Sequence, residues 1–377
     1  MSGNSQAVSG VFEADGRAGG HLRAEKVNYR IRANDPVVTP ALCTKLRLRG
    51  GETLIGEAGV ARRKRGPVAA EVTEVETING RPVDDHLEAK PFEDFVAIDP
   101  QTQLRFETTG GPLTMRVVDL LTPIGLGQRG LLVAPPRTGK TILLQHMAEG
   151  IATNFPDVYL MVLLVDERPE EVTEMRRMVR GEVIASSNDE DIASHVRIAR
   201  LMIEKAKRLA ETGLDVVVLL DSLTRLGRAF NANIRGSGRI MSGGLDIRAL
   251  TEPKSIFGAA RNLEDGGSLS VLASALIDTG SRMDEVIFNE FKGTGNMEIV
   301  LSREMANRRL WPAIDLEQSG TRKEDLLLTP ETLEVSYQIR RKLIGRGPVR
   351  SMETLLEAMK RYESNADFIA NFAKQGL

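Results

Sequence analysis

From residue 116 onwards, short apolar runs alternate with segments whose apolar residues recur at helical spacing. The runs predict buried parallel strands, and the segments between them predict helices. Predicted strands lie at residues 131–134, 158–165, 183–185, 216–220, 269–276 and 297–301; predicted helices lie at 142–151, 170–179 and 192–211. This alternation indicates an α/β fold in which helices cover both faces of a parallel sheet.

Residues 1–80 show a different pattern, in which short alternating stretches such as 27–31 and 46–49 are separated by turn signals such as Gly50-Gly51. Several short strands at this spacing predict a small β-barrel or sandwich of the oligonucleotide-binding type. Prolines and glycines interrupt residues 81–115, which we interpret as a linker. Residues 116–377 form the predicted second domain and end in a helical segment.

Composition narrows the protein class. The net charge of −2 gives no global basic field, so any nucleic-acid site must be local. The single cysteine, Cys43, excludes an intrachain disulfide and fits a reducing compartment. No apolar run approaches transmembrane length and the N-terminus is polar, so we expect a cytoplasmic protein without a membrane partner.

A local basic cluster lies in the predicted barrel, at residues 45–49 and 62–65. A small β domain with such a cluster is a candidate oligonucleotide binder, and a solvated surface is the alternative. Single-strand binders usually also carry stacking aromatic residues. Only Tyr29 lies between Phe12 and Phe92, which weakens the nucleic-acid interpretation.

Residues 130–141 read Gly-Leu-Leu-Val-Ala-Pro-Pro-Arg-Thr-Gly-Lys-Thr and join a predicted strand to a predicted helix. This arrangement is typical of a phosphate-binding loop, because backbone N–H groups at a helix N-terminus favour an anion. Lys140 would contact the terminal phosphates of a nucleotide, and Thr141 would hold Mg²⁺. The usual pattern begins with Gly where this chain has Ala134, and a strand-to-helix turn without a ligand is the alternative.

Two acidic positions follow predicted strands. Glu167 comes just after the run ending at Val165, where a carboxylate can orient and deprotonate an attacking water. A helix N-terminal acidic cluster is the alternative. Asp221 ends the run 216–220, the position at which P-loop enzymes place a carboxylate that reaches Mg²⁺ or its waters.

Three further segments leave alternatives open. The glycine-containing loops 231–244 and 291–296 carry basic residues and either contact a polyanion or only connect elements. The basic turn 319–323 is either a surface turn or, in an oligomeric ATPase, brings Arg322 to a neighbour's nucleotide. Trp311, the single tryptophan, either stacks on a base or belongs to the core.

Together these motifs resemble the bacterial transcription termination factor Rho family. The resemblance is dense from about residue 117 to 323, looser after that and weak before residue 87. It rests on the motifs at residues 134–141, 166–172, 220–225, 258–262, 275–281, 291–298 and 319–323. Even Ala134, which is irregular in a general phosphate loop, fits the version found in this family.

The resemblance implies a homohexameric ring with a RecA-like ATPase domain. Such a ring hydrolyses ATP between subunits, pulls single-stranded RNA through its central hole and dislodges transcripts from the RNA polymerase elongation complex. The resemblance also implies ATP and Mg²⁺ as cofactors, with Mg²⁺ served by Thr141 and Asp221.

Site residues are carried over position by position from the same resemblance. Glu167 would activate water, Arg168 would gate the site, and Arg309 and Arg322 would reach the adjacent subunit's nucleotide, with Arg322 as the arginine finger. The remaining ATP-binding residues would be Pro136, Arg137, Thr138, Gly139, Lys140 and Ile142, with Trp311 stacking on adenine. RNA would be gripped in the pore by Ser237, Gly238 and Arg239 and by Lys292, Gly293, Thr294 and Gly295.

The N-terminal region departs from the family. The stacking aromatic residues that the family's barrel usually carries are absent around residues 17–23, 37–38 and 67–68. Each stacked base contributes about 1–3 kcal/mol to single-strand binding. We therefore expect a weakened or altered primary RNA site and a retained motor.

Two other functions remain open. A RecA-like ring ATPase of the rotary or secretion type would move protein rather than RNA, and the glycine-rich loops with Arg239 and Lys292 argue against it. A non-catalytic nucleic-acid-binding regulator is disfavoured by the complete set of Lys140, Thr141, Glu167, Asp221 and Arg322.

Overall fold

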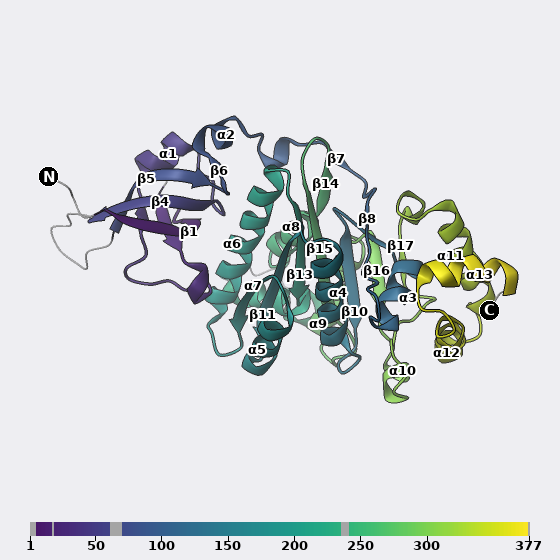
Figure 1. Cartoon of the computed structure of the whole chain (residues 1–377). Coiled ribbons are helices and arrows are strands. Elements are labelled where there is room, and N and C mark those ends of the chain that lie inside the picture. Colours follow the sequence, from purple (N-terminus) through teal and green to yellow (C-terminus); the bar gives the residue numbers. More distant parts are fainter. Residues whose placement is uncertain (1–4, 17–18, 61–69, 235–240, 376–377) are drawn as a thin grey trace. The chain divides into compact units, whose positions relative to one another are not determined.

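The computed structural model describes residues 5–16, 19–60, 70–234 and 241–375. These residues form two compact units that are not contiguous in sequence. Unit 1 comprises Met1–Val96, Arg197–Leu214 and Glu264–Gly267. Unit 2 comprises Ala97–Val196, Asp215–Leu263 and Ser268–Leu377 (Figure 1). The unit that holds the N-terminal strands thus extends beyond residues 1–80 and includes most of one long helix.

Unit 1 contains the predicted barrel. Strands β1 (Gln6–Ala14), β2 (Gly20–Arg23), β3 (Val37–Val38), β4 (Thr53–Val60) and β5 (Ala70–Ile78) pair in the order β3-β2-β1-β4-β5. A parallel bridge between Val37 and Glu71 closes the ring. The barrel interior is filled by apolar side chains that include Val8, Phe12, Leu22, Leu54 and Ile78. The prediction of a small β-barrel is therefore confirmed.

Two of the predicted barrel strands are wrong. The stretch 27–31 begins with the last residue of a short 3-10 turn, η1 (Glu25–Val27). Asn28 and Tyr29 then have positive φ values, which strands exclude. The stretch 46–49 begins with the last residue of helix α1 (Pro40–Leu46), whose C-cap residue Arg47 has a left-handed conformation. The side chain of Thr39 caps that helix and Pro40 is its first residue, which is a start signal that outweighs the alternation further on.

Short elements occupy the segment interpreted as a linker. They are β6 (Arg81–Pro82), α2 (Val83–Glu88), η2 (Phe92–Asp94), β7 (Ala97–Ile98) and β8 (Gln103–Leu104). Phe92 and Phe106 are both buried, at 1% and 0% exposure. These two aromatic side chains anchor the segment, each within its own unit.

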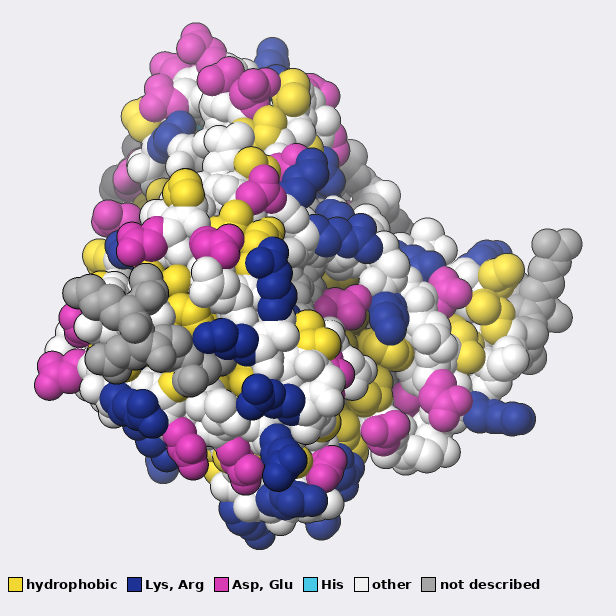
Figure 2. Space-filling model, turned by 90° about the vertical axis from the view of Figure 1, so that its right-hand side faces the viewer, with side chains coloured by type: hydrophobic (Ala, Val, Ile, Leu, Met, Phe, Trp, Pro, Cys, Tyr) yellow, Lys and Arg dark blue, Asp and Glu magenta, His cyan; other side chains and the backbone are white. Residues whose placement is uncertain are grey.

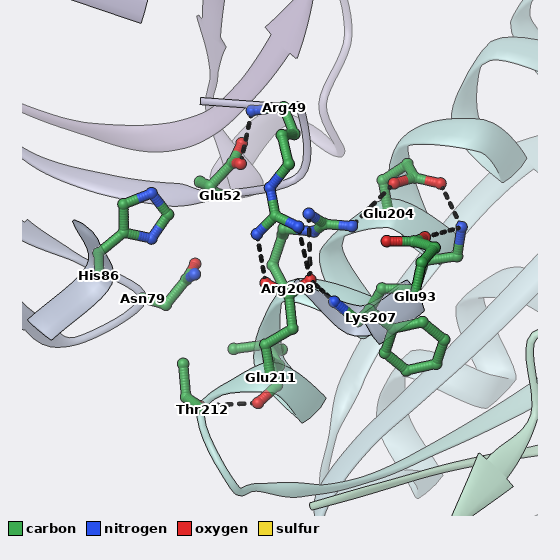
Figure 3. A network of polar contacts seen from close by, with 12 residues as sticks. Arg49, Glu52, Asn79, His86, Glu93, Glu204, Lys207, Arg208, Glu211 and Thr212 are labelled. Atoms are coloured by element: carbon green, nitrogen blue, oxygen red, sulfur yellow. Dashed lines mark hydrogen bonds and ion pairs between the residues drawn. The ribbon is translucent and has the colours of Figure 1, made fainter. Parts of the chain in front are cut away.

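A buried ionic network holds helix α6 (Ile192–Glu211) to the barrel within unit 1 (Figure 3). Arg49 Nη1 and Nη2 donate to Glu211 Oε1 and Oε2 at 2.9 and 2.5 Å. Glu211 also accepts from the backbone N–H of Phe92 at 2.7 Å and lies 3.1 Å from Arg208 Nη1. The side chains of Arg208 and Glu211 are only 2% and 3% exposed. A barrel without residues 197–214 would therefore lose the contacts that Glu211 makes with Arg49 and Phe92.

Replacing Glu211 with alanine should lower the free energy of unfolding by about 3 kcal/mol, because it leaves buried Arg208 and half-buried Arg49 without their shared carboxylate. Chemical denaturation of the full chain would measure this. Glu93→Ala is the matched control, since Glu93 is 60% exposed and its pair with Lys207 should contribute less than about 1 kcal/mol. Equal losses in the two variants would contradict the role given to Glu211.

Unit 2 is built on a largely parallel sheet in the order β12-β11-β13-β15-β10-β16-β17. The strands are β10 (Arg129–Ala134), β11 (Tyr159–Glu167), β12 (Glu182–Ser187), β13 (Asp215–Asp221), β15 (Ser268–Leu276), β16 (Met297–Val300) and β17 (Gly320–Thr321). Only the β16–β17 pair along this path is antiparallel. Beside it, β14 (Arg261–Leu263) pairs with β15 and β7, and β8 pairs with β9 (Ile124–Gly125). Each predicted strand of this domain is confirmed.

Helices cover both faces of this sheet (Figure 1). One set packs together as α3 (Leu113–Leu121), α4 (Lys140–Asn154) and α5 (Pro169–Met178). The other set consists of α7 (Leu223–Asn233), α8 (Thr251–Gly258) and α9 (Arg282–Lys292). Because the parallel strands point the same way, their carboxyl ends meet at one edge, where the functional residues are expected.

The chain ends in helices α11 (Pro330–Leu343), α12 (Pro348–Met359) and α13 (Asn365–Gln375), preceded by the short α10 (Arg303–Asn307). Figure 2 shows the molecule from the side on which these helices lie in Figure 1. Lys and Arg side chains are spread over this face among Asp and Glu side chains, in keeping with the net charge of −2. Within the described ranges, no helix is long and apolar enough to cross a membrane.

Candidate active site

The phosphate-loop sequence forms a tight turn between β10 and α4. Arg137 and Gly139 both have positive φ values, 66° and 87°. The hydroxyl of Thr138 donates to the carbonyl of Pro135 at 2.7 Å and closes the turn from inside. Helix α4 begins directly at Lys140, so its first N–H groups face the loop without intrahelical partners. This geometry suits a bound phosphate.

Lys140, Glu167 and Asp221 come from three different elements and converge at the carboxyl edge of the sheet. Lys140 Nζ donates to Asp221 Oδ1 at 2.5 Å and to Glu167 Oε1 at 3.2 Å. Burial opposes the charge of Lys140, but the two carboxylates outweigh it and raise the pKa of Lys140. The structure thus brings together three residues that the sequence analysis assigned to one site.

Glu167 is 2% exposed and carries one oxygen that is available for chemistry. Its Oε2 atom has no hydrogen-bond partner among the described residues and lies 3.4 Å from Arg225 Nη2, an ion-pair distance without hydrogen-bond geometry. Burial, followed by the nearby Asp221 carboxylate, raises the pKa of Glu167, while Lys140 and Arg225 act in the opposite direction. A carboxyl group with these properties can accept a proton from water.

Two supporting residues were not identified from the sequence. Ser274, near the carboxyl end of β15, donates to Asp221 Oδ1 at 2.7 Å. A serine inside a buried apolar run is the sequence signal that could have identified it. Arg225, in the first turn of α7, donates to the backbone carbonyl of Asp166 and approaches Glu167. Ser274 thus orients the carboxylate of Asp221, and Arg225 orients that of Glu167.

The donor set fits Mg²⁺. A magnesium ion in a nucleotide site is usually held by one or two protein oxygens together with phosphate oxygens and waters. Thr141 supplies a hydroxyl on the first turn of α4, and Asp221 supplies a buried carboxylate. Within the described ranges, no cluster of three or more acidic, histidine or cysteine ligands is found.

A cavity of 250 Å³ adjoins the phosphate loop. Its lining includes Gly139, Ile142 and Trp311, and it is mostly apolar. Trp311 and Ile142 are 44% and 49% exposed, so Trp311 is not a core residue. A Cβ atom on Gly139 would lie 2.8 Å from the Trp311 ring, which shows how closely the indole approaches the loop. The cavity suits an aromatic base stacked on the indole.

The three arginines predicted to act in catalysis lie in different places. Arg168 is exposed at the N-cap of α5, next to Glu167. Arg309 is exposed two residues before Trp311, on the segment that follows the carboxyl end of β16. Arg322 follows β17. It lies at the end of the sheet where the parallel strands begin, opposite the end that carries the phosphate loop.

The position of Arg322 follows from strand register. Thr321 pairs with Met297, and Met297 pairs with Gly130 near the start of β10. The phosphate loop begins only after Ala134, about 13 Å further along β10 at roughly 3.3 Å per residue. The backbone N–H of Arg322 donates to the carbonyl of Asn296 at 2.9 Å, which fixes the turn at this edge. Arg322 is therefore well separated from the phosphate loop of its own chain.

The turn containing Lys292, Gly293, Thr294 and Gly295 lies at the same edge as Arg322. Arg129 Nε donates to the carbonyl of Thr294, and Asn296 Oδ1 accepts from Arg129 N at 2.9 Å. Lys292 itself is exposed, with its Nζ 5.7 Å from the centre of the Phe288 ring. The other predicted RNA residues, Ser237, Gly238 and Arg239, lie outside the described residues.

Comparison with known proteins agrees with this geometry. The family model described as ATP synthase alpha/beta family, nucleotide-binding domain, matches residues 114–321. Two solved ATPases of type III secretion systems share the fold: one from pathogenic bacteria has a TM-score of 0.62 at 19% identity, covering 84% of this chain and 94% of its own. The other, EscN of enteropathogenic E. coli, has a TM-score of 0.57 at 20% identity, covering 84% and 75%. At these identities they show a RecA-like P-loop fold and no more.

Curated relatives are much more similar. Transcription termination factor Rho of Cereibacter sphaeroides is 49% identical over 365 residues, covering 95% of this chain and 85% of its own. The Aquifex aeolicus protein of that name is 48% identical over 366 residues, covering 96% and 84%. The Escherichia coli K12 protein is 47% identical over 370 residues, covering 97% and 88%. The chain therefore belongs to the transcription termination factor Rho family and is an ATP-hydrolysing enzyme of the P-loop class.

Proposed function

We propose that this chain is an RNA-dependent ATPase that works as a homohexameric ring, pulls nascent single-stranded RNA through its centre and terminates transcription at the RNA polymerase elongation complex. The observation that carries the ring is the placement of Arg322 and the phosphate loop at opposite edges of one sheet. A complete site then needs two subunits, and repeating such a head-to-tail contact generates a ring. The family membership supports RNA and RNA polymerase as partners.

The proposed reaction assigns a task to each residue of the site. Lys140 neutralises the terminal phosphates, Glu167 receives a proton from the attacking water, and Arg168 gates the site. Mg²⁺, held by Thr141 and Asp221 when nucleotide is bound, would supply charge neutralisation on the phosphate oxygens. Arg322 of the neighbouring subunit would stabilise the charge that develops in the transition state, with Arg309 assisting. Because Arg309 lies at the phosphate-loop edge, its action in trans is supported less by the geometry than that of Arg322.

RNA contact is proposed for the loop around Ser237, Gly238 and Arg239 and for the turn from Lys292 to Gly295. In the described turn, Lys292 is exposed next to Gly293, so the backbone of a polyanion can approach this cation closely. The experiment that tests the whole proposal is the ATPase rate of the full chain against a panel of RNA homopolymers. Stimulation by RNA is expected; a rate that no RNA changes would favour the alternative of a protein-moving ring ATPase of the rotary or secretion type.

The pH profile of ATP hydrolysis should reveal Glu167. Because burial raises its pKa above the ordinary glutamate value, the base is ionised only above that raised pKa. The acid limb of kcat/KM should therefore lie at higher pH than an ordinary glutamate would give, with activity falling as the pH falls through it. Glu170→Gln, an exposed residue in the first turn of α5, is the control and should leave the limb in place. An acid limb at the ordinary glutamate pKa would contradict the assignment.

The barrel supports a weakened primary RNA site. Residues 1–92 contain three aromatic residues besides histidine, namely Phe12, Tyr29 and Phe92. All three are buried, with 2%, 1% and 1% exposure, and therefore cannot stack on RNA bases. Tyr29 is further engaged by Lys205 Nζ, which donates to its hydroxyl at 3.0 Å.

Restoring aromatic residues to the barrel should strengthen RNA binding. His21 and Val37 are half-buried partners on adjacent strands, so His21→Phe with Val37→Tyr would offer two neighbouring rings. At about 1–3 kcal/mol per stacked base, a gain of roughly tenfold or more in affinity is expected. Filter binding measures this affinity. The full chain should be used, because a fragment of residues 1–110 would lack the part of α6 that belongs to the same unit as the barrel. Thr73→Phe, exposed on β5, is the control; an equal gain there, or tight binding by the unmodified chain, would contradict the weakened site.

A further inference from the structure

His146 lies on the nucleobase side of the active site. It is four residues after Ile142 on α4, so the two side chains share one face of the helix. Both line the 250 Å³ cavity that also contains Trp311. The cavity extends from the phosphate loop, through Gly139, to the segment Pro312–Ala313–Ile314.

Polar side chains are few in this cavity. Besides the indole N–H of Trp311, the lining residues with polar side-chain atoms are Thr114, Thr138 and His146. The hydroxyl of Thr138 is already used, because it donates to the carbonyl of Pro135. Ligand pockets typically combine an apolar lining with a small number of polar groups that fix orientation and specificity. His146 is such a group.

The imidazole of His146 lacks partners. Its Nδ1 atom is buried and has no hydrogen-bond partner in the described part of the chain. Burial lowers the pKa of His146, although the Glu149 carboxylate acts in the opposite direction, so the ring is neutral near neutral pH. A neutral imidazole offers one donor and one acceptor, and leaving the buried Nδ1 atom without a partner is unfavourable. A ligand in the cavity would supply what the protein does not.

We propose that His146 recognises the group at position 6 of a purine base held between Trp311 and Ile142, and so contributes base specificity to the enzyme. This inference rests on the proposed ATP site. Stacking on Trp311 accepts any flat base, because every base has a π-face. Discrimination needs a polar contact to the base edge, and a site built around such a contact rejects a ligand that lacks it.

A double-mutant cycle on binding tests the proposal without depending on turnover. The probes are ADP and purine riboside 5′-diphosphate, which has hydrogen in place of the amino group at position 6. The unmodified chain should bind ADP about fivefold or more tightly than the second probe, and His146→Leu should reduce that ratio to about one. Glu149→Gln is the control, since Glu149 is exposed on the same helix and should leave the ratio unchanged.

The outcomes separate this inference from the function on which it rests. If the unmodified chain binds neither diphosphate, the proposed ATP site fails. If it binds ADP and the ratio is the same in His146→Leu, the inference about His146 is overturned. Should His146→Leu not fold, the imidazole ¹⁵N shifts of His146 in the unmodified chain decide. They should move with ADP more than with purine riboside diphosphate, and equal movement with both probes would overturn the inference.

Discussion

Replacing Lys140 with alanine is expected to abolish ATP hydrolysis, lowering kcat by roughly a thousandfold or more. The ammonium group of Lys140 is the cation nearest to both carboxylates of the site, 2.5 Å from Asp221 Oδ1 and 3.2 Å from Glu167 Oε1. When nucleotide binds, the same group is in position to neutralise phosphate oxygens. Turnover therefore falls because the negative charge on the phosphate oxygens is no longer stabilised. Such stabilisation is largest in a site with little water, where the dielectric constant is low.

The same substitution should also destabilise the empty protein. Asp221 and Glu167 are 1% and 2% exposed, and without Lys140 two buried carboxylates face each other. Breaking a buried ion pair in this way costs about 3–5 kcal/mol, partly relieved because Glu167 can take up a proton. Thermal unfolding with and without ADP, measured beside the ATPase rate, separates the two effects.

Lys254→Ala is the matched control for Lys140→Ala. Lys254 pairs with Glu290 in unit 2, but the side chains of the two are 38% and 35% exposed. Such a pair contributes at most about 1 kcal/mol, and neither residue is near the phosphate loop by sequence. Normal turnover in Lys140→Ala, with a folded chain, would show that the loop is not the hydrolytic site.

The convergence of Lys140, Glu167 and Asp221 could be predicted from sequence because it depends on few facts. Each residue follows an apolar run, and the three runs form parallel strands, so their carboxyl ends share one edge. The register of the strands and the turns that follow them then bring the three side chains together, so no knowledge of long-range contacts is needed to predict the convergence. The α/β domain was predictable for the same reason, since runs buried on both faces have few alternatives.

Contacts that depend on partners distant in the chain could not be predicted. Helix α6 was correctly located by its periodicity, but an amphipathic face does not say which domain buries it. Glu211 on α6 pairs both with Arg208 of the same helix and with Arg49 of the barrel, and nothing local in the sequence marks Glu211 and Arg49 as partners. Likewise, His146 reads as one polar residue on an amphipathic helix until the segment after β16 is seen on the other side of the cavity.

The two mispredicted strands have a local cause. Alternation at residues 46–49 favoured a strand, yet the Thr39-Pro40 start of α1 sets the backbone before that alternation begins. Helix propagation from a capped start then carries the chain to Leu46, and a left-handed Arg47 ends it. In a segment this short, an N-cap residue followed by proline therefore predicts the backbone better than a few alternating apolar and polar residues do.

Replacing Arg322 with alanine should lower kcat by about 10³-fold or more, as expected for loss of an arginine finger, while ADP binding to the same chain stays intact. Binding is spared because Arg322 lies at the edge opposite its own phosphate loop. Lys323→Ala is the matched control: Lys323 is 63% exposed and paired with Asp99, one residue further along the same turn. It should change the rate little.

Mixing two inactive variants distinguishes action in trans from action in cis. A subunit with Arg322→Ala keeps Glu167, and a subunit with Glu167→Gln keeps Arg322. In randomly mixed rings about one interface in four combines the intact half of each, so part of the activity should return. If Arg322 acted within its own chain, every site would keep one defect and mixing would restore nothing. No rescue in rings shown to contain both variants would therefore rule out the shared site, whereas rescue would show that a single subunit holds only half of it.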